Sequence, residues 1–94
     1  TDEDLRDEIP DAIWRAKMMA ELRPRGLRYF EELLPVFAGW PDAPCGFLHF
    51  SAGYNAEADY ALSQRWAYHK IAASHFHMLV DPVATTQAIV DMFV

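Results

Sequence analysis

The sequence has 94 residues, so it is at most one domain, and its 52% hydrophobic content with 6 Phe, 4 Tyr and 3 Trp is high for so short a chain. A chain of this size buries only a small core, and we therefore expect some of its apolar surface to contact something outside the chain. The formal net charge of −6 excludes a basic surface for phosphates, and no apolar run approaches the roughly 20 residues that span a bilayer, so we expect neither nucleic acid nor membrane as a partner.

Residues 1–43 are predicted to be a helical segment. Apolar residues at steps of three and four fall near one helix face, and the helix is predicted to run to about residue 22: Ile9, Ile13, Trp14, Met18 and Leu22. Pro10 suits the first turn of this helix, and Pro24 and Gly26 break it. A short second helix is predicted at 27–34, with three large apolar residues on it: Phe30, Leu33 and Leu34.

Residues 44–94 are predicted to form a βαβα unit of the α/β class. A short, mostly apolar strand at 46–50 leads through a loop into a helix at 56–66, and a second strand follows at 68–73. Asp81 and Pro82 have the residue types of a helix N-cap and first helical position. Strand, helix and strand joined over this length form parallel neighbours with a right-handed crossover. Two parallel strands are too few for a stable sheet, so we expect further strands from a missing segment or another chain.

The most informative stretch follows the second predicted strand, where His75 enters a loop that ends at Asp81-Pro82. This order places an imidazole at the carboxyl edge of a parallel sheet, which is where ligands bind in open α/β folds. A histidine at that edge can take a proton from a hydroxyl nucleophile and return it to a leaving group. His75 is therefore the candidate catalytic base.

The residues around His75 resemble the last strand and helix of the α/β-hydrolase family: a His-Phe pair, a few loop residues, Asp-Pro and an amphipathic terminal helix. Upstream, residues 44–51, the helix after them and Trp66 resemble the penultimate strand–helix unit of the family. Residues 1–43 are similar to the cap-to-core helices that precede it. The resemblance implies that the chain is the C-terminal portion of such a hydrolase.

By this resemblance His75 is the catalytic histidine, and His77 matches no functional position. The family's nucleophile elbow, Gly-x-Ser-x-Gly, is absent. The loop after the first strand lacks an early Asp where the family often places its acid, which leaves Glu57 and Asp59 as later candidates or puts the acid outside this chain. The resemblance implies hydrolysis of a small-molecule ester or amide by Ser-His-acid acyl transfer, with the nucleophile in a missing N-terminal hydrolase portion or a partner chain. We expect no cofactor, and an inactive isolated chain.

Two other sites compete with this interpretation. Ser51 follows a strand and precedes a helix, but His49 stands where the tight elbow turn needs a small residue. His75 and His77 with the later carboxylate of Asp81 suggest a zinc set, but a third ligand at suitable spacing is not evident. Neither a serine nucleophile in this chain nor a metal site is therefore expected.

The remaining polar and sulfur side chains favour structural roles. His49 and His69 lie on predicted strands and are expected to pack. The arginine cluster at 23–28 is expected to be a solvated helix end with favourable dipole interactions, with contact to a cap or an anionic substrate as the alternative. Cys45 directly precedes a strand and is expected to be buried rather than reactive.

The sequence also indicates a compartment. Cys45 is the single cysteine and cannot form an internal disulfide, which fits a reducing environment. The acidic start at residues 1–4 is unlike a signal peptide and lacks a Met. We expect a cytoplasmic protein with a processed or truncated N-terminus.

A second class of function fits the same pattern. The chain could be a non-catalytic βαβ module that assembles through an exposed sheet edge. In that interpretation His75 is an ordinary loop histidine that the backbone satisfies. Both interpretations require a partner surface, either the rest of a hydrolase or a second copy of the chain.

Overall fold

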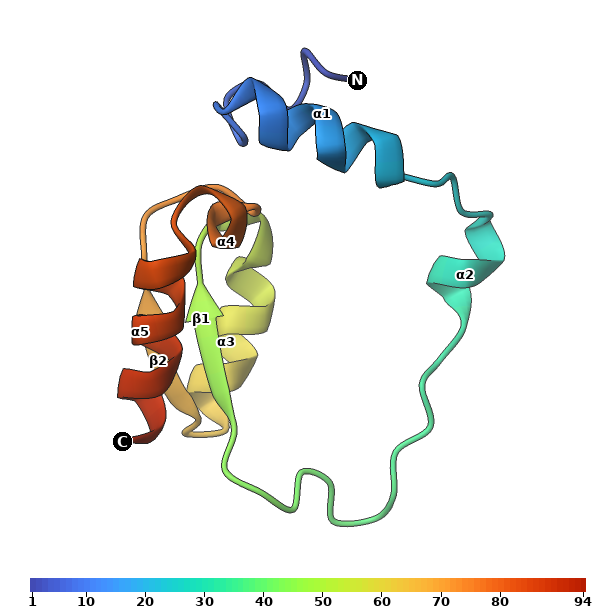
Figure 1. Ribbon diagram of the computed structural model, residues 1–94. Helices are drawn as coiled ribbons and strands as arrows, with labels where there is room; N and C mark the ends of the chain where they lie inside the picture. The colour runs from blue at the N-terminus through green and yellow to red at the C-terminus, as the bar shows by residue number, and fades with distance from the viewer.

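The computed structural model describes residues 1–94. The chain forms a βαβα body and a helical N-terminal part, and a long arm of residues 32–45 joins the two (Figure 1). The body contains β1 (Gly46–His49), the 3-10 helix η1 (Ala52–Tyr54), α3 (Asn55–Ser63), β2 (Ala67–Lys70), α4 (His77–Val80) and α5 (Pro82–Phe93). The N-terminal part contains α1 (Ala12–Glu21) and α2 (Leu27–Glu31). The helices and strands follow the predicted order, with the short α4 and η1 added.

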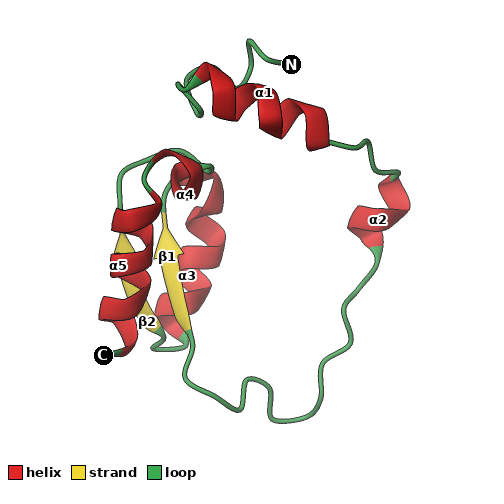
Figure 2. Cartoon of the chain, in the orientation of Figure 1, coloured by secondary structure: helices red, strands yellow, loops and turns green.

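β1 and β2 are parallel neighbours in a two-stranded sheet, with Gly46 opposite Ala67. α3 makes the crossover between them, which confirms the predicted βαβ unit and the α/β class. α3 and α5 both pack on the sheet, one on each side of it (Figure 2). Successive side chains of a strand alternate between the faces, and β1 agrees with this arrangement. A Cβ at Gly46 would contact Phe93 of α5, whereas Phe47 lines a hollow with residues of α3.

Small residues form the contacts between the helices and the sheet. Ala58 and Ala61 of α3 are buried, and so are Thr85 and Ala88 of α5. α5 comes so close to β1 that a Cβ on Gly46 would lie 2.7 Å from Cζ of Phe93. Small side chains allow this close approach, but they bury little apolar area. At about 25 cal/mol per Å², the hydrophobic stabilisation of the body is therefore modest.

Several element boundaries differ from the prediction. α1 begins at Ala12 after the N-cap Asp11, so Pro10 precedes the helix and does not belong to its first turn. β2 spans Ala67–Lys70 rather than 68–73, because β1, its partner in the sheet, ends at His49. α3 ends before 66 because Arg65 has a left-handed φ of 58°, which stops the helix. α2 ends before 34 because Pro35 disfavours helical backbone in the residue before it and has no N–H to continue the ladder.

α1 begins at the N-cap Asp11, whose carboxylate accepts hydrogen bonds from the N–H groups of Ile13 and Trp14. The predicted apolar face of this helix is largely uncovered, since Ile13 is 70% and Trp14 is 47% exposed. Ile9, which precedes the helix, is the member of this face that is fully buried. No other helix or strand of the chain packs extensively on α1, so its apolar face is left open.

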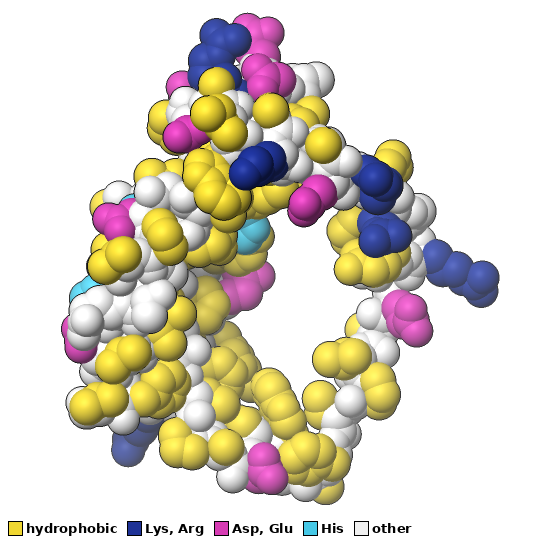
Figure 3. Space-filling view, in the orientation of Figure 1, with side chains coloured by type: hydrophobic (Ala, Val, Ile, Leu, Met, Phe, Trp, Pro, Cys, Tyr) yellow, Lys and Arg dark blue, Asp and Glu magenta, His cyan; other side chains and the backbone are white.

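The molecule is more open than a compact chain of its length. Its Cα radius of gyration is 15.8 Å, against about 12 Å expected for 94 residues. Its accessible surface of 7583 Å² exceeds the expected area by about 2,000 Å². The arm passes around an opening beside the body (Figure 3), and its apolar side chains are exposed, Leu33 and Leu34 among them. No helix combines the length and apolar character that crossing a membrane requires.

Candidate functional site

The candidate site lies at the carboxyl edge of the two-stranded sheet. β1 and β2 both run toward this edge, so the loops that follow them meet there (Figure 1). The Ile71 N–H donates to the His49 carbonyl at 2.9 Å. The Ala73 N–H donates to the Phe50 carbonyl at 3.3 Å, so the two loops stay side by side beyond the strand ends. His75 follows directly, in the position that the sequence predicts.

The imidazole of His75 is exposed and is held by aromatic rings. It stacks on Tyr54 from the loop after β1, with 4.9 Å between ring centroids and 13° between planes. Phe76 approaches it edge-on at 5.0 Å. The Tyr54 hydroxyl lies 3.5 Å from Nε2, which is well beyond the usual length of a hydrogen bond from a hydroxyl. Stacking rather than hydrogen bonding therefore orients this ring.

An apolar hollow of about 220 Å³ adjoins the His75 ring, and its other lining residues are Phe47, Leu48, Phe50, Tyr54 and Met78. Phe47 and Leu48 are neighbours on β1, so their side chains point to opposite faces of the sheet. The hollow therefore runs along the unpaired edge of β1. An apolar group in it would lie beside a histidine side chain that can exchange protons.

Tyr54 and Met78 are site residues that the sequence interpretation missed. Tyr54 could have been found, because it follows β1 and parallel strands bring their following loops to one edge. Met78 could not, because it belongs to α4, a single helical turn that the sequence did not indicate.

The two candidate acids are not paired with His75. Glu57 and Asp59 are exposed residues of α3, and no hydrogen bond or salt bridge joins either of them to the imidazole. Glu57 lines a separate hollow with Phe47 and Tyr60 on the α3 side of the sheet. That an acid orients His75 therefore stays a prediction, and neither candidate is in place to do so.

Ser51 does not have the backbone of a nucleophile elbow. Its φ of −124° and ψ of 160° are extended and unstrained, whereas an elbow is a sharp, strained turn. Its hydroxyl makes no hydrogen bond to His75. Its carbonyl accepts from Tyr54 N–H and from Nε2 of His49, so Ser51 closes the turn after β1.

His49 is buried and structural, as expected, with 4% of its surface exposed. Nδ1 lies 2.8 Å from the Tyr68 hydroxyl and Nε2 lies 2.9 Å from the Ser51 carbonyl. His69 behaves differently from the prediction and is exposed.

His77 begins α4 and packs edge-on against Phe50, with 5.4 Å between ring centroids. Its N–H donates to the Ser74 carbonyl, which places it in the turn that follows His75. The structure contains no cluster of three or more His, Cys, Asp or Glu side chains that could hold a metal ion.

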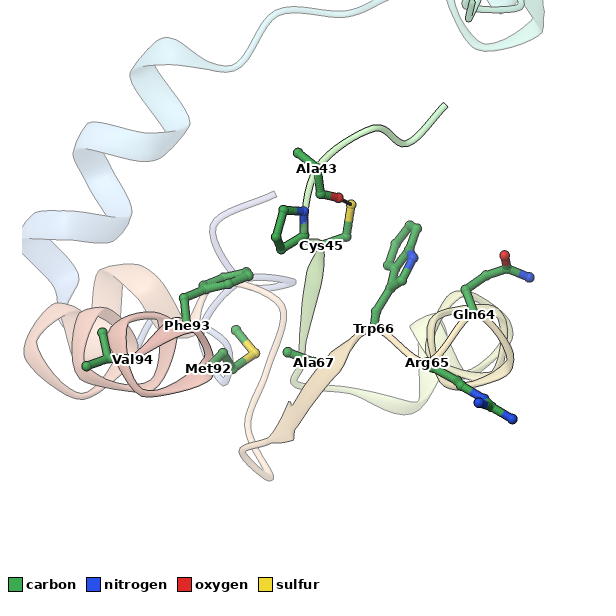
Figure 4. Close-up of a pocket in the computed structure, with 10 residues that line it drawn as sticks. Ala43, Cys45, Gln64, Arg65, Trp66, Ala67, Met92, Phe93 and Val94 are labelled. Carbon is green, nitrogen blue, oxygen red and sulfur yellow. Dashed lines mark hydrogen bonds between the residues drawn. The ribbon is translucent and has the colours of Figure 1, made fainter. Parts of the chain in front are cut away.

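A second hollow, of about 540 Å³, lies at the opposite, amino edge of the sheet (Figure 4). Half-buried Cys45 lines it together with Trp66, Met92 and Phe93. Because Cys45 is half-buried, its predicted burial is only partial. Its thiol lies 3.4 Å from the Ala43 carbonyl. The hollow lies away from His75 and holds no candidate base.

The arginine cluster behaves as the expected solvated helix end. Arg23 donates from Nη1 to the carbonyls of Ala20 and Leu22, at 2.8 and 2.9 Å. These carbonyls belong to the end of α1, where a cation is favourable. Arg25 lies over the ring of Tyr29 at 5.5 Å, and all three arginines of the cluster are exposed.

Comparisons with known protein families, curated proteins and solved structures find no match to this chain. The resemblance to α/β-hydrolases therefore rests on the sequence alone, above all on the residues around His75.

Proposed function

We propose that this chain is the C-terminal portion of an α/β-hydrolase, and that His75 is the general base of its Ser-His-acid acyl transfer from small-molecule esters or amides. The position of His75 carries the proposal. Its exposed imidazole lies at the carboxyl edge of a parallel βαβ unit, beside an apolar hollow. Its Nε2 has no closer partner than the Tyr54 hydroxyl at 3.5 Å, so a substrate or nucleophile hydroxyl can take that place.

The nucleophile and oxyanion hole belong, in this proposal, to a part of the hydrolase outside this chain. Ser51 has an extended backbone and no bond to His75, which argues against it as the nucleophile. The unpaired edge of β1 supports the need for further structure, because parallel sheets are normally covered and continued by other strands. A strand beside β1 would also close the hollow next to His75.

The proposal is tested with His75→Ala, introduced in the cells that naturally make the protein so that it is purified with all of its natural parts. His77→Ala is the matched control. His75→Ala should lower the rate of ester hydrolysis by roughly a thousandfold or more, the loss that follows removal of a triad member. His77→Ala should cost far less, because His77 packs against Phe50 and lies past the candidate site. Equal loss in two folded variants, or loss only in His77→Ala, would refute the assignment of His75.

A second candidate function is a non-catalytic assembly module. The surface excess of about 2,000 Å² and the two open strand edges favour it, since such surface normally marks an interface. In this alternative the protein from its own cells hydrolyses none of a broad panel of esters and amides. It also remains in a larger complex that dissociates when the arm residues Leu33 and Leu34 are replaced by Asp.

A further inference from the structure

A long-range hydrogen bond fixes the residue directly before His75. The hydroxyl of Ser74 donates to the backbone carbonyl of Glu8 at 3.1 Å, across 66 positions of sequence. This hydrogen bond is partly buried, so water competes only partly with the Ser74 hydroxyl for the Glu8 carbonyl. The loop that carries His75 is therefore tied to the N-terminal part as well as to the loop after β1.

The N-terminal end of this tie is itself held by Arg15. Arg15 is 9% exposed, which is unusual for an arginine, and its Nη1 donates to the carbonyl of Ile9 at 2.9 Å. Its Nε forms a salt bridge with Asp2 at 2.8 Å. Arg15 thus folds the chain before α1 into a fixed turn, and the Glu8 carbonyl belongs to that turn.

Apolar burial places the same turn against the body. Ile9 is 1% exposed and is the largest fully buried side chain of the protein. It lines a hollow together with Leu79, Val80 and Pro82, which join α4 to α5 just after the His75 loop. Hydrogen bonding and burial therefore both dock this turn onto the segment that contains His75.

We propose that residues 2–15 form an N-terminal clamp that positions His75. Ser74 is the contact through which the clamp acts, and Arg15 is the residue that gives the clamp its shape. The Ser74–Glu8 bond holds the loop backbone, and Tyr54 stacks on the imidazole. That the clamp assists catalysis rests on the proposed function. That it holds the His75 side chain in place does not.

Nuclear magnetic resonance of the 94-residue chain tests the positioning directly. The Tyr54 ring should shift the His75 ring protons upfield because the two rings are stacked, and Tyr54→Leu should abolish the shift. Ser74→Ala should reduce the shift, and Ser74→Thr should keep it because the hydroxyl is retained. Full retention of the shift in Ser74→Ala, or its absence from the unsubstituted chain, would overturn the clamp.

Arg15→Ala gives a second route to the same readout. It should reduce the His75 ring shift although Arg15 makes no contact with His75, while the amides of β1 and β2 keep their protection from hydrogen exchange. An unchanged ring shift in a folded Arg15→Ala variant would count against the clamp. Unfolding of this variant would show instead that Arg15 supports the whole body, and that also contradicts a local positioning role.

Kinetics separate this inference from the proposed function. In the hydrolase, Ser74→Ala should lower kcat roughly tenfold to a hundredfold with little change in KM, and Ser74→Thr should restore it. If the ring shift falls in Ser74→Ala but the unsubstituted protein shows no hydrolysis, the clamp stands and the hydrolase proposal fails. If hydrolysis requires His75 but Ser74→Ala changes neither kcat nor the ring shift, the clamp fails alone.

Discussion

Replacement of Tyr68 by Phe removes one atom from the most buried polar network of the body. Nε2 of His49 faces the Ser51 carbonyl at 2.9 Å, and a carbonyl can only accept, so Nε2 carries the proton. Nδ1 is then the acceptor for the Tyr68 hydroxyl at 2.8 Å. Phe at 68 deletes that donor and leaves Nδ1 without a partner in a residue that is 4% exposed.

The expected cost follows from these contacts. A net hydrogen bond contributes about 1 kcal/mol, and an unsatisfied buried acceptor costs about 1–3 kcal/mol. Tyr68 is half-buried, so water relieves part of the penalty, and we expect the free energy of unfolding to fall by about 1–2 kcal/mol. With a urea m-value of about 1 kcal/mol per M for a small chain, the unfolding midpoint falls by about 1–2 M.

The shift of the unfolding midpoint is measured by urea unfolding monitored with circular dichroism, with Tyr60→Phe as the control. Tyr60 is 50% exposed and its hydroxyl makes no hydrogen bond, so its substitution should leave the midpoint nearly unchanged. Equal midpoints for the two variants would refute the stabilising role of the network. Nitrogen chemical shifts that place the His49 proton on Nδ1 would contradict the tautomer from which the argument starts.

Three further predictions concern the chain as it stands. The 94-residue chain should not turn over p-nitrophenyl acetate, because an imidazole without a positioned nucleophile is a weak catalyst, and turnover that disappears in Ser51→Ala would contradict this. The chain should associate with itself or with a hydrolase core, because its apolar surface is uncovered, and a clean monomer in size-exclusion chromatography at high concentration would argue against it. Ala61→Leu should destabilise the body by about 1–3 kcal/mol through overpacking, whereas Ala56→Leu at an exposed site of the same helix should not, as urea midpoints would show.

The βαβα unit could be predicted because its signals are local. The apolar run at β1, the Asp81-Pro82 helix start and the length of the crossover each depend on a few neighbouring residues, and the structure confirms them. Asp81 accepts from the Ala84 N–H at 3.0 Å, as an N-cap should. The strand ends could not be predicted, because they depend on how far the partner strand continues.

The site could be predicted only in part, for a similar reason. Parallel topology brings His75 to the carboxyl edge, and this placement follows from the sequence. His77 already begins α4, so the helical turn gives it a different neighbour, Phe50. Ser74 bonds to Glu8 across 66 positions of sequence, and no local pattern predicts such a contact.

If a partner covers the exposed surface, as both proposed functions imply, the size of that surface bears on what kind of partner it is. A standard interface buries about 800 Å² on each partner, whereas this chain exposes about 2,000 Å² more than a compact chain of its length. The exposed apolar residues include residues of α1, the arm and α5; α1 and the arm border the opening, whereas α5 lies on the far side of the body from it (Figure 1). A transient partner would cover one patch, but a cover that reaches all of these elements must contact the chain on more than one side. The cover is therefore expected to act as a continuation of the core, with strands beside β1, rather than as a separate protein docked on one face.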